Sequence, residues 1–413
     1  MIRLRSRYPV FTALAILLFA TPLFAQDWPQ WRGPNRDGAV ATRIAAWPRA
    51  LREEWKVTVG LGHASPVVAG NRIYVFARQG EEETLLCLDA ATGKEIWKTS
   101  EPISYTMHPA AVGHGKGPKS TPVITGNNVF TLGISGVLAA HDAKTGKLKW
   151  RHEFSQQYPK TSPLFGTAMS PIVDGGLLIA HVGGHDKGAL TAFDPETGAV
   201  KWTNELDGPA YASPIIVTLA GARQIVTFMQ KEFVGVDAAT GKLLWNLPAK
   251  TEYDENSITA ISYKDMIIFS RMDKGVFAIR LAKQGSEIVP QEVWSNTENM
   301  LYLSTPVVQG STLLGFSMLK KGQFFSLDAD TGKTLWQGPG RMGENAALIN
   351  AGGSVFLGLT NEANLIVLPV NAKEFAPTVQ YTVASSPTWA HPVVNGNRIL
   401  IKDETTLRSL ALR

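Results

Sequence analysis

One segment of the sequence comes close to a phosphate-binding loop. It runs Gly113-His-Gly-Lys-Gly-Pro-Lys119-Ser120, but Pro118 stands where the pattern requires its second glycine. We expect a strand after it, so the helix N-terminus that helps such loops to bind phosphate is missing. The sequence therefore argues against a nucleotide site, and leaves either a small anion site or a flexible basic loop.

Two further residue sets invite a chemical interpretation and do not support one. His181 and His185-Asp186 would share one face of a helix, but here a strand and a loop after two glycines are expected, so we predict no metal site. Cys87 lies between two leucines and is expected to be a small buried residue. A single cysteine excludes an internal disulfide, a cysteine-based zinc cluster and a C-x-x-C-H haem attachment. No hydrolase elbow is present, so we predict no catalytic residue.

Charge and composition indicate a globular protein without a nucleic-acid partner. The chain has 413 residues, 44% of them hydrophobic, and a formal net charge of +5. Three of the positive charges are Arg3, Arg5 and Arg7, and no basic stretch interleaved with aromatics occurs elsewhere.

The first 25 residues have the pattern of a secretory signal peptide. A basic start leads into the apolar run 10–20, and small residues precede Gln26. No cysteine follows the run, so no lipid anchor is expected. We predict an exported protein, periplasmic or secreted, that is monomeric and not anchored in a membrane once the signal is cleaved. The leader 26–50 contains Trp28, Trp31 and Trp47, which either pack on the domain or form a docking strip for a partner.

A repeat of about 47 residues decides the predicted fold. The pattern D-x-x-T-G-x-x-x-W occurs at 89–97, 142–150, 194–202, 237–245 and 328–336. Ser-Pro or Thr-Pro followed by aliphatic residues precedes these copies. The tryptophans that we expect to dock one repeat on the next are Trp55, Trp97, Trp150, Trp202, Trp245, Trp294 and Trp336, with Tyr381 in the following place. This period, with several short strands per unit, is typical of a propeller blade.

The repeats predict an all-β, eight-bladed β-propeller with four strands in each blade. The first strands of the blades are expected to begin near residues 64, 120, 169, 212, 257, 304, 346 and 391. The eighth unit ends after three strands, and we expect the segment 53–59 to complete it. Closing the ring in this way removes an exposed sheet edge.

The D-x-x-T-G-x-x-x-W copies resemble the PQQ-like, or quinoprotein, propeller family over residues 51–413, where they are known as tryptophan-docking motifs. The leader 27–38 looks like that of exported members. The resemblance implies an eight-bladed ring. It leaves function open, because the family includes PQQ-dependent alcohol dehydrogenases as well as the non-enzymatic propeller of the outer-membrane β-barrel assembly machinery.

Variable loops predict which face of the disc carries a binding site. The turns on one face are short and alike, whereas the other face has two long connections, 101–119 and 154–168. We place a site over blades 1 to 3 of that face or in the central funnel beneath it, where a flat polar ligand would fit. The candidates at the funnel are His63, Lys119, Tyr211, Asn256, Tyr302, Asn345 and Trp389. Further candidates in the loops are His108, His114, Lys116, His185, Asp186 and Lys187.

We favour a non-catalytic binding or scaffold protein of the cell envelope, without a cofactor and with a protein or envelope component as partner. The alternative is a PQQ-dependent dehydrogenase that lacks the vicinal disulfide on which many family enzymes stack the quinone. Its calcium ligands could come from Glu255-Asn256 and Glu344-Asn345. A third alternative is a sensor that binds a small ligand in the funnel.

Overall fold

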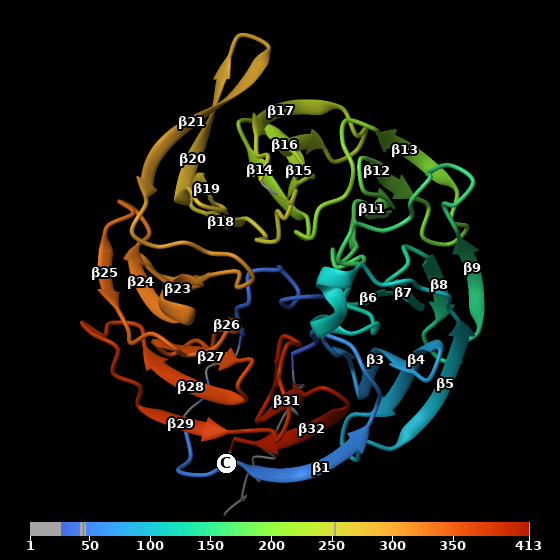
Figure 1. Ribbon diagram of the computed structural model, residues 1–413, viewed down its shortest axis with the longest axis horizontal. Coiled ribbons are helices and arrows are strands. Elements are labelled where there is room, and N and C mark those ends of the chain that lie inside the picture. The colour runs from blue at the N-terminus through green and yellow to red at the C-terminus, as the bar shows by residue number, and fades with distance from the viewer. Residues whose placement is uncertain (1–25, 42–43, 45–46, 252, 413) are drawn as a thin grey trace, which may run out of the picture.

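The computed structural model describes residues 26–41, 44, 47–251 and 253–412; the predicted signal peptide lies outside this range. Eight four-stranded antiparallel sheets stand around a central axis, as predicted (Figure 1). In each sheet the first strand of the repeat lies nearest the axis and the last strand lies at the rim.

Blades 1 to 4 follow the chain in order. Their strands are β2 (Val67–Ala69), β3 (Arg72–Gln79), β4 (Glu82–Asp89) and β5 (Glu95–Pro102); β6 (Val123–Thr125), β7 (Asn128–Leu132), β8 (Leu138–Asp142) and β9 (Leu148–His152); β10 (Ile172–Asp174), β11 (Leu177–Gly184), β12 (Lys187–Phe193) and β13 (Val200–Asn204); β14 (Ile215–Leu219), β15 (Ala222–Phe228), β16 (Glu232–Asp237) and β17 (Leu243–Pro248).

Blades 5 to 8 continue the ring. Their strands are β18 (Ile261–Tyr263), β19 (Met266–Arg271), β20 (Gly275–Gln284) and β21 (Glu287–Asn296); β22 (Val307–Gln309), β23 (Thr312–Ser317), β24 (Gln323–Asp328) and β25 (Thr334–Gln337); β26 (Ala346–Asn350), β27 (Val355–Thr360), β28 (Asn364–Pro369) and β29 (Val379–Thr382); β30 (Val393–Asn395), β31 (Arg398–Lys402) and β32 (Thr406–Ala411) with β1 (Arg52–Thr58). Two short 3-10 helices lie in loops, η1 (Pro109–His114) and η2 (Leu319–Lys321).

The ring closes between its two ends, as the sequence predicts. Strand β1 pairs antiparallel with β32, and Trp55 lies opposite Ser409. Strands from the two ends of the ring thus share one sheet, so opening blade 8 requires breaking this ladder.

The inner strands begin about three residues later than predicted, except in blade 7, where the prediction matches the start of β26. The cause is the Ser/Thr-Pro element, since proline has no N–H to donate to a ladder. The hydroxyl group of the Ser or Thr in this element accepts a hydrogen bond from the neighbouring blade. Ser65 N–H donates to Thr121 Oγ1 at 3.0 Å, and Thr121 N–H donates to Ser170 Oγ at 3.0 Å. Similar bonds join further blades, so these residues form a polar belt around the axis.

The aspartates of the repeat cap the outer hairpin turns. In blade 1, Asp89 Oδ1 accepts hydrogen bonds from the backbone N–H groups of Ala91 and Thr92 and from the Thr92 hydroxyl. The tryptophan of one blade lies over the glycine of this turn in the next blade. A Cβ built on Gly146 would stand 2.5 Å from the Trp97 ring, and one on Gly93 would stand 2.5 Å from the Trp55 ring. Five of the docking tryptophans have such a glycine beneath them: Trp55, Trp97, Trp150, Trp202 and Trp294.

Blade 5 departs from the repeat. Its hairpin β20–β21 has two ten-residue strands and extends beyond the rim (Figure 1). Trp245 of blade 4 consequently has no docking glycine, and its indole N–H donates to Gln224 Oε1 at 2.6 Å.

Candidate functional site

The leader lies in the central channel and gives the funnel a floor. Trp28 is fully buried and exchanges two backbone hydrogen bonds with Val68 of blade 1. Pro29 O accepts from Ile124 N–H of blade 2, and Gly38 and Val40 bond to Asn350 of blade 7. Figure 1 shows this segment crossing the middle of the ring. Of the two predicted roles for the leader tryptophans, Trp28 takes the packing role.

Two buried arginines fasten the leader to the inner strands. The Arg36 guanidinium donates to Ser170 O at 3.0 Å, to Pro214 O at 3.0 Å and to Pro171 O. The Arg32 guanidinium donates to Pro306 O at 2.7 Å and to Thr305 O at 3.0 Å. Burial lowers the pKa of Arg36 to about 9 and that of Arg32 to about 10. The bonds at Trp28 and Pro29 and those of the two arginines together join the leader to opposite sides of the channel.

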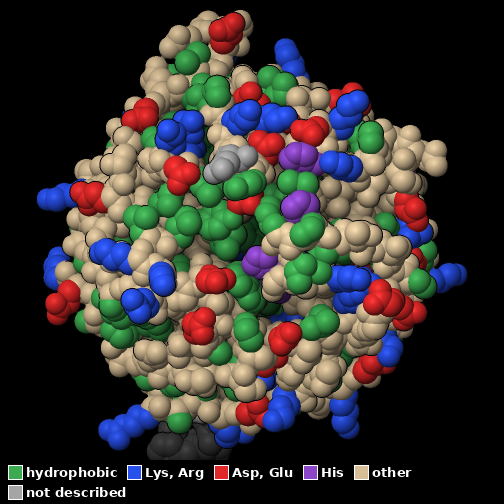
Figure 2. All heavy atoms as spheres, in the orientation of Figure 1, with side chains coloured by type: hydrophobic (Ala, Val, Ile, Leu, Met, Phe, Trp, Pro, Cys, Tyr) green, Lys and Arg blue, Asp and Glu red, His purple; other side chains and the backbone are tan. Residues whose placement is uncertain are grey.

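Above this floor lies a cavity of about 990 Å³ at the mouth of the funnel. Its walls combine aromatic rings with groups of both charges. The lining residues are His63, His114, Lys119, Phe165, Ala168, Tyr211, Glu255, Ser257, Tyr302, Leu303, Met318, Lys321, Gly322, Arg341, Gly343, Glu344, Asn345, Glu362 and Trp389. Figure 2 shows this face, with hydrophobic and histidine side chains gathered around its centre.

Six of the seven predicted funnel residues line the cavity, and Asn256 does not. The Asn256 amide donates to the carbonyls of Met229, Gln230 and Ala249, so it braces blade 4. Its neighbour Glu255 lines the cavity instead. Five of the loop candidates do not line the cavity: His108, Lys116, His185, Asp186 and Lys187.

Sequence reasoning predicted Tyr302 and Asn345 on the wall formed by blades 6 and 7 but missed three charged residues there. Lys321, Arg341 and Glu362 line the cavity from short loops. The period of the repeat places these loops on the funnel face, but their short length gives no signal of a binding role. The cavity is therefore shared around the ring and not confined to blades 1 to 3.

An aromatic stack forms one wall. The His63 and Trp389 rings are parallel within 10° with centroids 5.2 Å apart, and His114 meets both of them edge-on. Burial, and then the charge of Lys119, lowers the pKa of His63 to about 3, and the same two causes lower the pKa of His114. Both imidazoles are therefore neutral at pH 7, and this wall offers aromatic surface without charge.

A polar pair forms the facing wall. The Tyr302 hydroxyl donates to a Glu255 carboxylate oxygen, and burial and this carboxylate raise the pKa of Tyr302. The Asn345 side-chain oxygen accepts from the Ser304 hydroxyl at 2.8 Å. These groups already have partners within the fold, so a ligand would have to compete for them.

The residues proposed as calcium ligands do not assemble into a calcium site. Calcium takes six to eight oxygen ligands. Here the Asn256 amide is directed into the backbone, Asn345 Oδ1 accepts from Ser304, and Glu255 accepts from Tyr302. The single cysteine, Cys87, is fully buried within blade 1. Glu255, Glu344 and Asn345 line the cavity, whereas the chain, with one cysteine, cannot form the vicinal disulfide on which many family enzymes stack the quinone.

A group of metal-ligating type lies elsewhere. Within the described residues, His185, Asp186 and Asp254 are the one set of three His, Cys, Asp or Glu side chains that gathers closely. The Gln230 amide donates to His185 Nδ1, since its oxygen accepts from Asp186 N–H. His185 Nε2 lies 3.6 Å from a carboxylate oxygen of Asp186 and 3.9 Å from one of Asp254. His181 bonds to Asp207 O and lies apart from the set.

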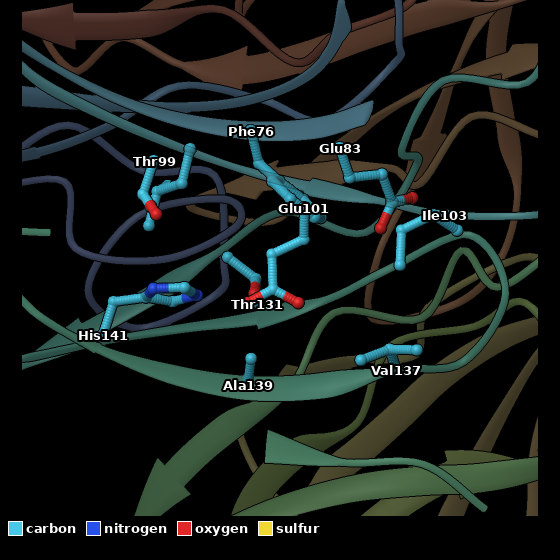
Figure 3. Close-up of a pocket in the computed structure, with 10 residues that line it drawn as sticks. Phe76, Glu83, Thr99, Glu101, Ile103, Thr131, Val137, Ala139 and His141 are labelled. Atoms are coloured by element: carbon cyan, nitrogen blue, oxygen red, sulfur yellow. The ribbon is translucent and has the colours of Figure 1, made fainter. Parts of the chain in front are cut away.

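A second, smaller cavity of about 30 Å³ lies between blades 1 and 2. Glu83 and Glu101 approach it from blade 1, and Thr131 and His141 from blade 2 (Figure 3). Glu83 accepts from Ile134 N–H at 2.8 Å, and burial raises its pKa to about 7. The cavity has room for about one water molecule and no ligand.

Comparison with known proteins identifies the class first. The fold is that of PQQ-like propellers. It is similar to the crystal structure of BamB from Moraxella catarrhalis, with a TM-score of 0.62, 13% identity and coverage of 88% of this chain and 100% of that one. It is also similar to quinohemoprotein alcohol dehydrogenase ADHIIG from Pseudomonas putida HK5, with a TM-score of 0.69, 13% identity and coverage of 94% of this chain and 80% of that one. The fold alone does not separate the two kinds of relative.

The sequence matches to the two kinds of relative differ in extent. The family model described as outer membrane protein assembly factor BamB matches residues 38–103 and 81–338, and the chain belongs to this family. BamB from Yersinia pestis is 23% identical over 366 residues, which cover 84% of this chain and 85% of that protein. A polyvinylalcohol dehydrogenase from a Pseudomonas species is 25% identical over 326 residues, but these cover 61% of this chain and 50% of the enzyme.

No helix within the described part of the chain combines the length and apolarity needed to cross a membrane.

Proposed function

We propose that this protein is an exported, non-catalytic binding scaffold of the cell envelope that uses the funnel face to hold a protein partner. The supporting observation is the extent of the sequence match. The match to BamB runs along most of both chains, whereas the match to the dehydrogenase spans half of the enzyme. By analogy with the relatives' name, the partner belongs to the assembly of outer-membrane proteins. We further propose that the chain acts as a monomer in the periplasm.

The funnel face offers apolar side chains to a partner. Val112 of η1 is 62% exposed, and Leu303, Met318 and Leu319 are exposed around the cavity. Lys321 and Arg341 add positive charge at the same rim. Exposed apolar groups beside charged ones are a common composition of protein interfaces, where a few central residues supply most of the binding energy.

Site-specific photocrosslinking in the native cells tests this proposal. A photoreactive residue at Val112 or Leu319 should crosslink to one envelope protein. The matched control is Val200, which is 54% exposed on the outer strand β13 and should give no such product. Equal crosslinking from Val200, or none from the funnel face, would contradict the proposal.

A PQQ-dependent dehydrogenase is the second candidate, because curated relatives of this kind match and the funnel carries aromatic and cationic groups. The hydrogen bonds that Glu255, Asn256 and Asn345 make within the fold argue against a calcium site formed by these residues. This candidate requires quinone binding that depends on calcium, together with dye reduction by an alcohol.

A further inference from the structure

Lys119 occupies an unusual position in the funnel. Its side chain lines the cavity beside His63 and Tyr211, and its Nζ donates one hydrogen bond, to Phe165 O at 2.5 Å. The backbone N–H of Phe165 in turn donates to the Tyr211 hydroxyl at 3.2 Å. The ammonium group is thus held at the cavity wall by one partner.

No carboxylate of the described chain forms an ion pair with this lysine. The titratable groups nearest to it are the two imidazoles, which are neutral at pH 7, and the Tyr211 phenol. The carboxylates and the other cations of the cavity are Glu255, Glu344, Glu362, Lys321 and Arg341. Burial without a compensating anion disfavours the charged form, and it lowers the pKa of Lys119 to about 8.

We propose that Lys119 captures aldehydes reversibly as imines in the funnel. The neutral amine attacks the carbonyl carbon, a C–N bond forms, and the C=O π electrons move to oxygen. One proton passes from nitrogen to this oxygen, the resulting hydroxyl group leaves as water with the second nitrogen proton, and a C=N bond remains. Nothing is oxidised or reduced. Lysines desolvated in apolar pockets are well suited to this chemistry.

The walls indicate which aldehydes would fit. Trp389, Phe165 and Tyr211 present aromatic surface near the amine, and Lys321 and Arg341 offer positive charge in the same cavity. An aromatic aldehyde with an anionic substituent matches both features. This inference goes beyond the proposed scaffold function and does not depend on it.

Lys402 provides a natural comparison. It is fully buried, and burial lowers its pKa to about 8 as well. Its Nζ donates to three carbonyls, those of Gly62, Asp403 and Glu404, and it does not line the cavity. The geometry therefore assigns the reaction to Lys119, because all three Lys402 donors are already used within the fold.

Reductive trapping tests the inference. The full chain is treated with 4-formylbenzoate and cyanoborohydride at pH 7, digested and mapped by mass spectrometry. We expect Lys119 to be modified at least ten times faster than the exposed Lys321 and than Lys402, and Lys119→Arg to lose this label. Lys94→Arg, at an exposed lysine that does not line the cavity, is the matched control and should keep it.

If Lys119→Arg fails to fold, the test still rests on the protein without substitutions, in which the labelling rate of Lys119 is compared with those of Lys321 and Lys402. Modification spread evenly over exposed lysines, or an unlabelled Lys119, would overturn the inference. Photocrosslinking at the funnel face does not depend on this chemistry, so the two proposals can fail separately.

Discussion

At the residue scale, environment and not residue type decides which side chains face the funnel. Glu255 and Asn256 are neighbours in the loop before β18, yet Glu255 lines the cavity and the Asn256 amide bonds to the backbone of blade 4. The sequence shows both residue types but not this direction. His63 and Trp389 are far apart in the sequence and meet only because the ring closes.

The buried carboxyl of Glu83 predicts a pH effect on stability. Its pKa is about 7 in the folded state, against an ordinary value of 4.5. The folded state holds the proton more tightly, so this contribution is complete below pH 4.5 and is lost as pH rises to 7. The shift corresponds to roughly 3 kcal/mol at most.

Glu83→Gln cannot ionise and keeps an acceptor for Ile134 N–H. Its free energy of unfolding should therefore fall less between pH 5 and pH 8 than that of the unmodified protein, as measured by urea denaturation. Glu95→Gln, at an exposed position, is the control. Parallel pH profiles for the unmodified protein and Glu83→Gln would show that the carboxyl is not buried as described.

At the element scale, the blade is the part of the structure that the sequence predicts best. The Asp-x-x-Thr-Gly turn, the four strands and the closing strand β1 follow from a local pattern repeated many times. The inner strands other than that of blade 7 begin later than predicted because the Ser/Thr-Pro element bonds to the neighbouring blade and not within its own sheet. Such a bond has no signature within one repeat.

The docking of tryptophan on glycine can be isolated within blade 2. Gly146 and Gly126 both have positive φ, at +74° and +56°, but only Gly146 lies under a ring, that of Trp97. Gly126→Ala should cost about 1 kcal/mol for its backbone conformation. Gly146→Ala should cost roughly 2–4 kcal/mol, because the new methyl group displaces the ring. Equal losses of stability in urea denaturation would exclude the docking contribution.

At the scale of the whole molecule, the leader turns an open ring into a floored funnel. Arg32 and Arg36 bond to carbonyls of strands more than 130 residues away in the sequence. Every residue has a backbone carbonyl, so the sequence does not show which carbonyls accept hydrogen bonds from the leader. The role of the leader therefore stayed open. The blade count could be predicted, whereas the closure of the channel could not.

Arg36→Met tests whether the leader holds the ring together. The substitution leaves the carbonyls of Ser170, Pro171 and Pro214 without their donor in a buried channel, and we expect a loss of roughly 2–4 kcal/mol in unfolding free energy. Arg52→Met, at a side chain that is 69% exposed, should change stability by less than about 0.5 kcal/mol. A similar small effect at Arg36 would mean that the leader is dispensable for the ring.

The central claim is that this propeller binds a partner and does not catalyse quinone-dependent oxidation. Isothermal titration of the purified mature protein with PQQ, with and without calcium, tests this claim most directly. The account predicts no calcium-dependent heat and no dye reduction when an alcohol is added. Saturable binding of micromolar affinity or better that requires calcium, with alcohol-dependent dye reduction, would contradict the account and establish a dehydrogenase.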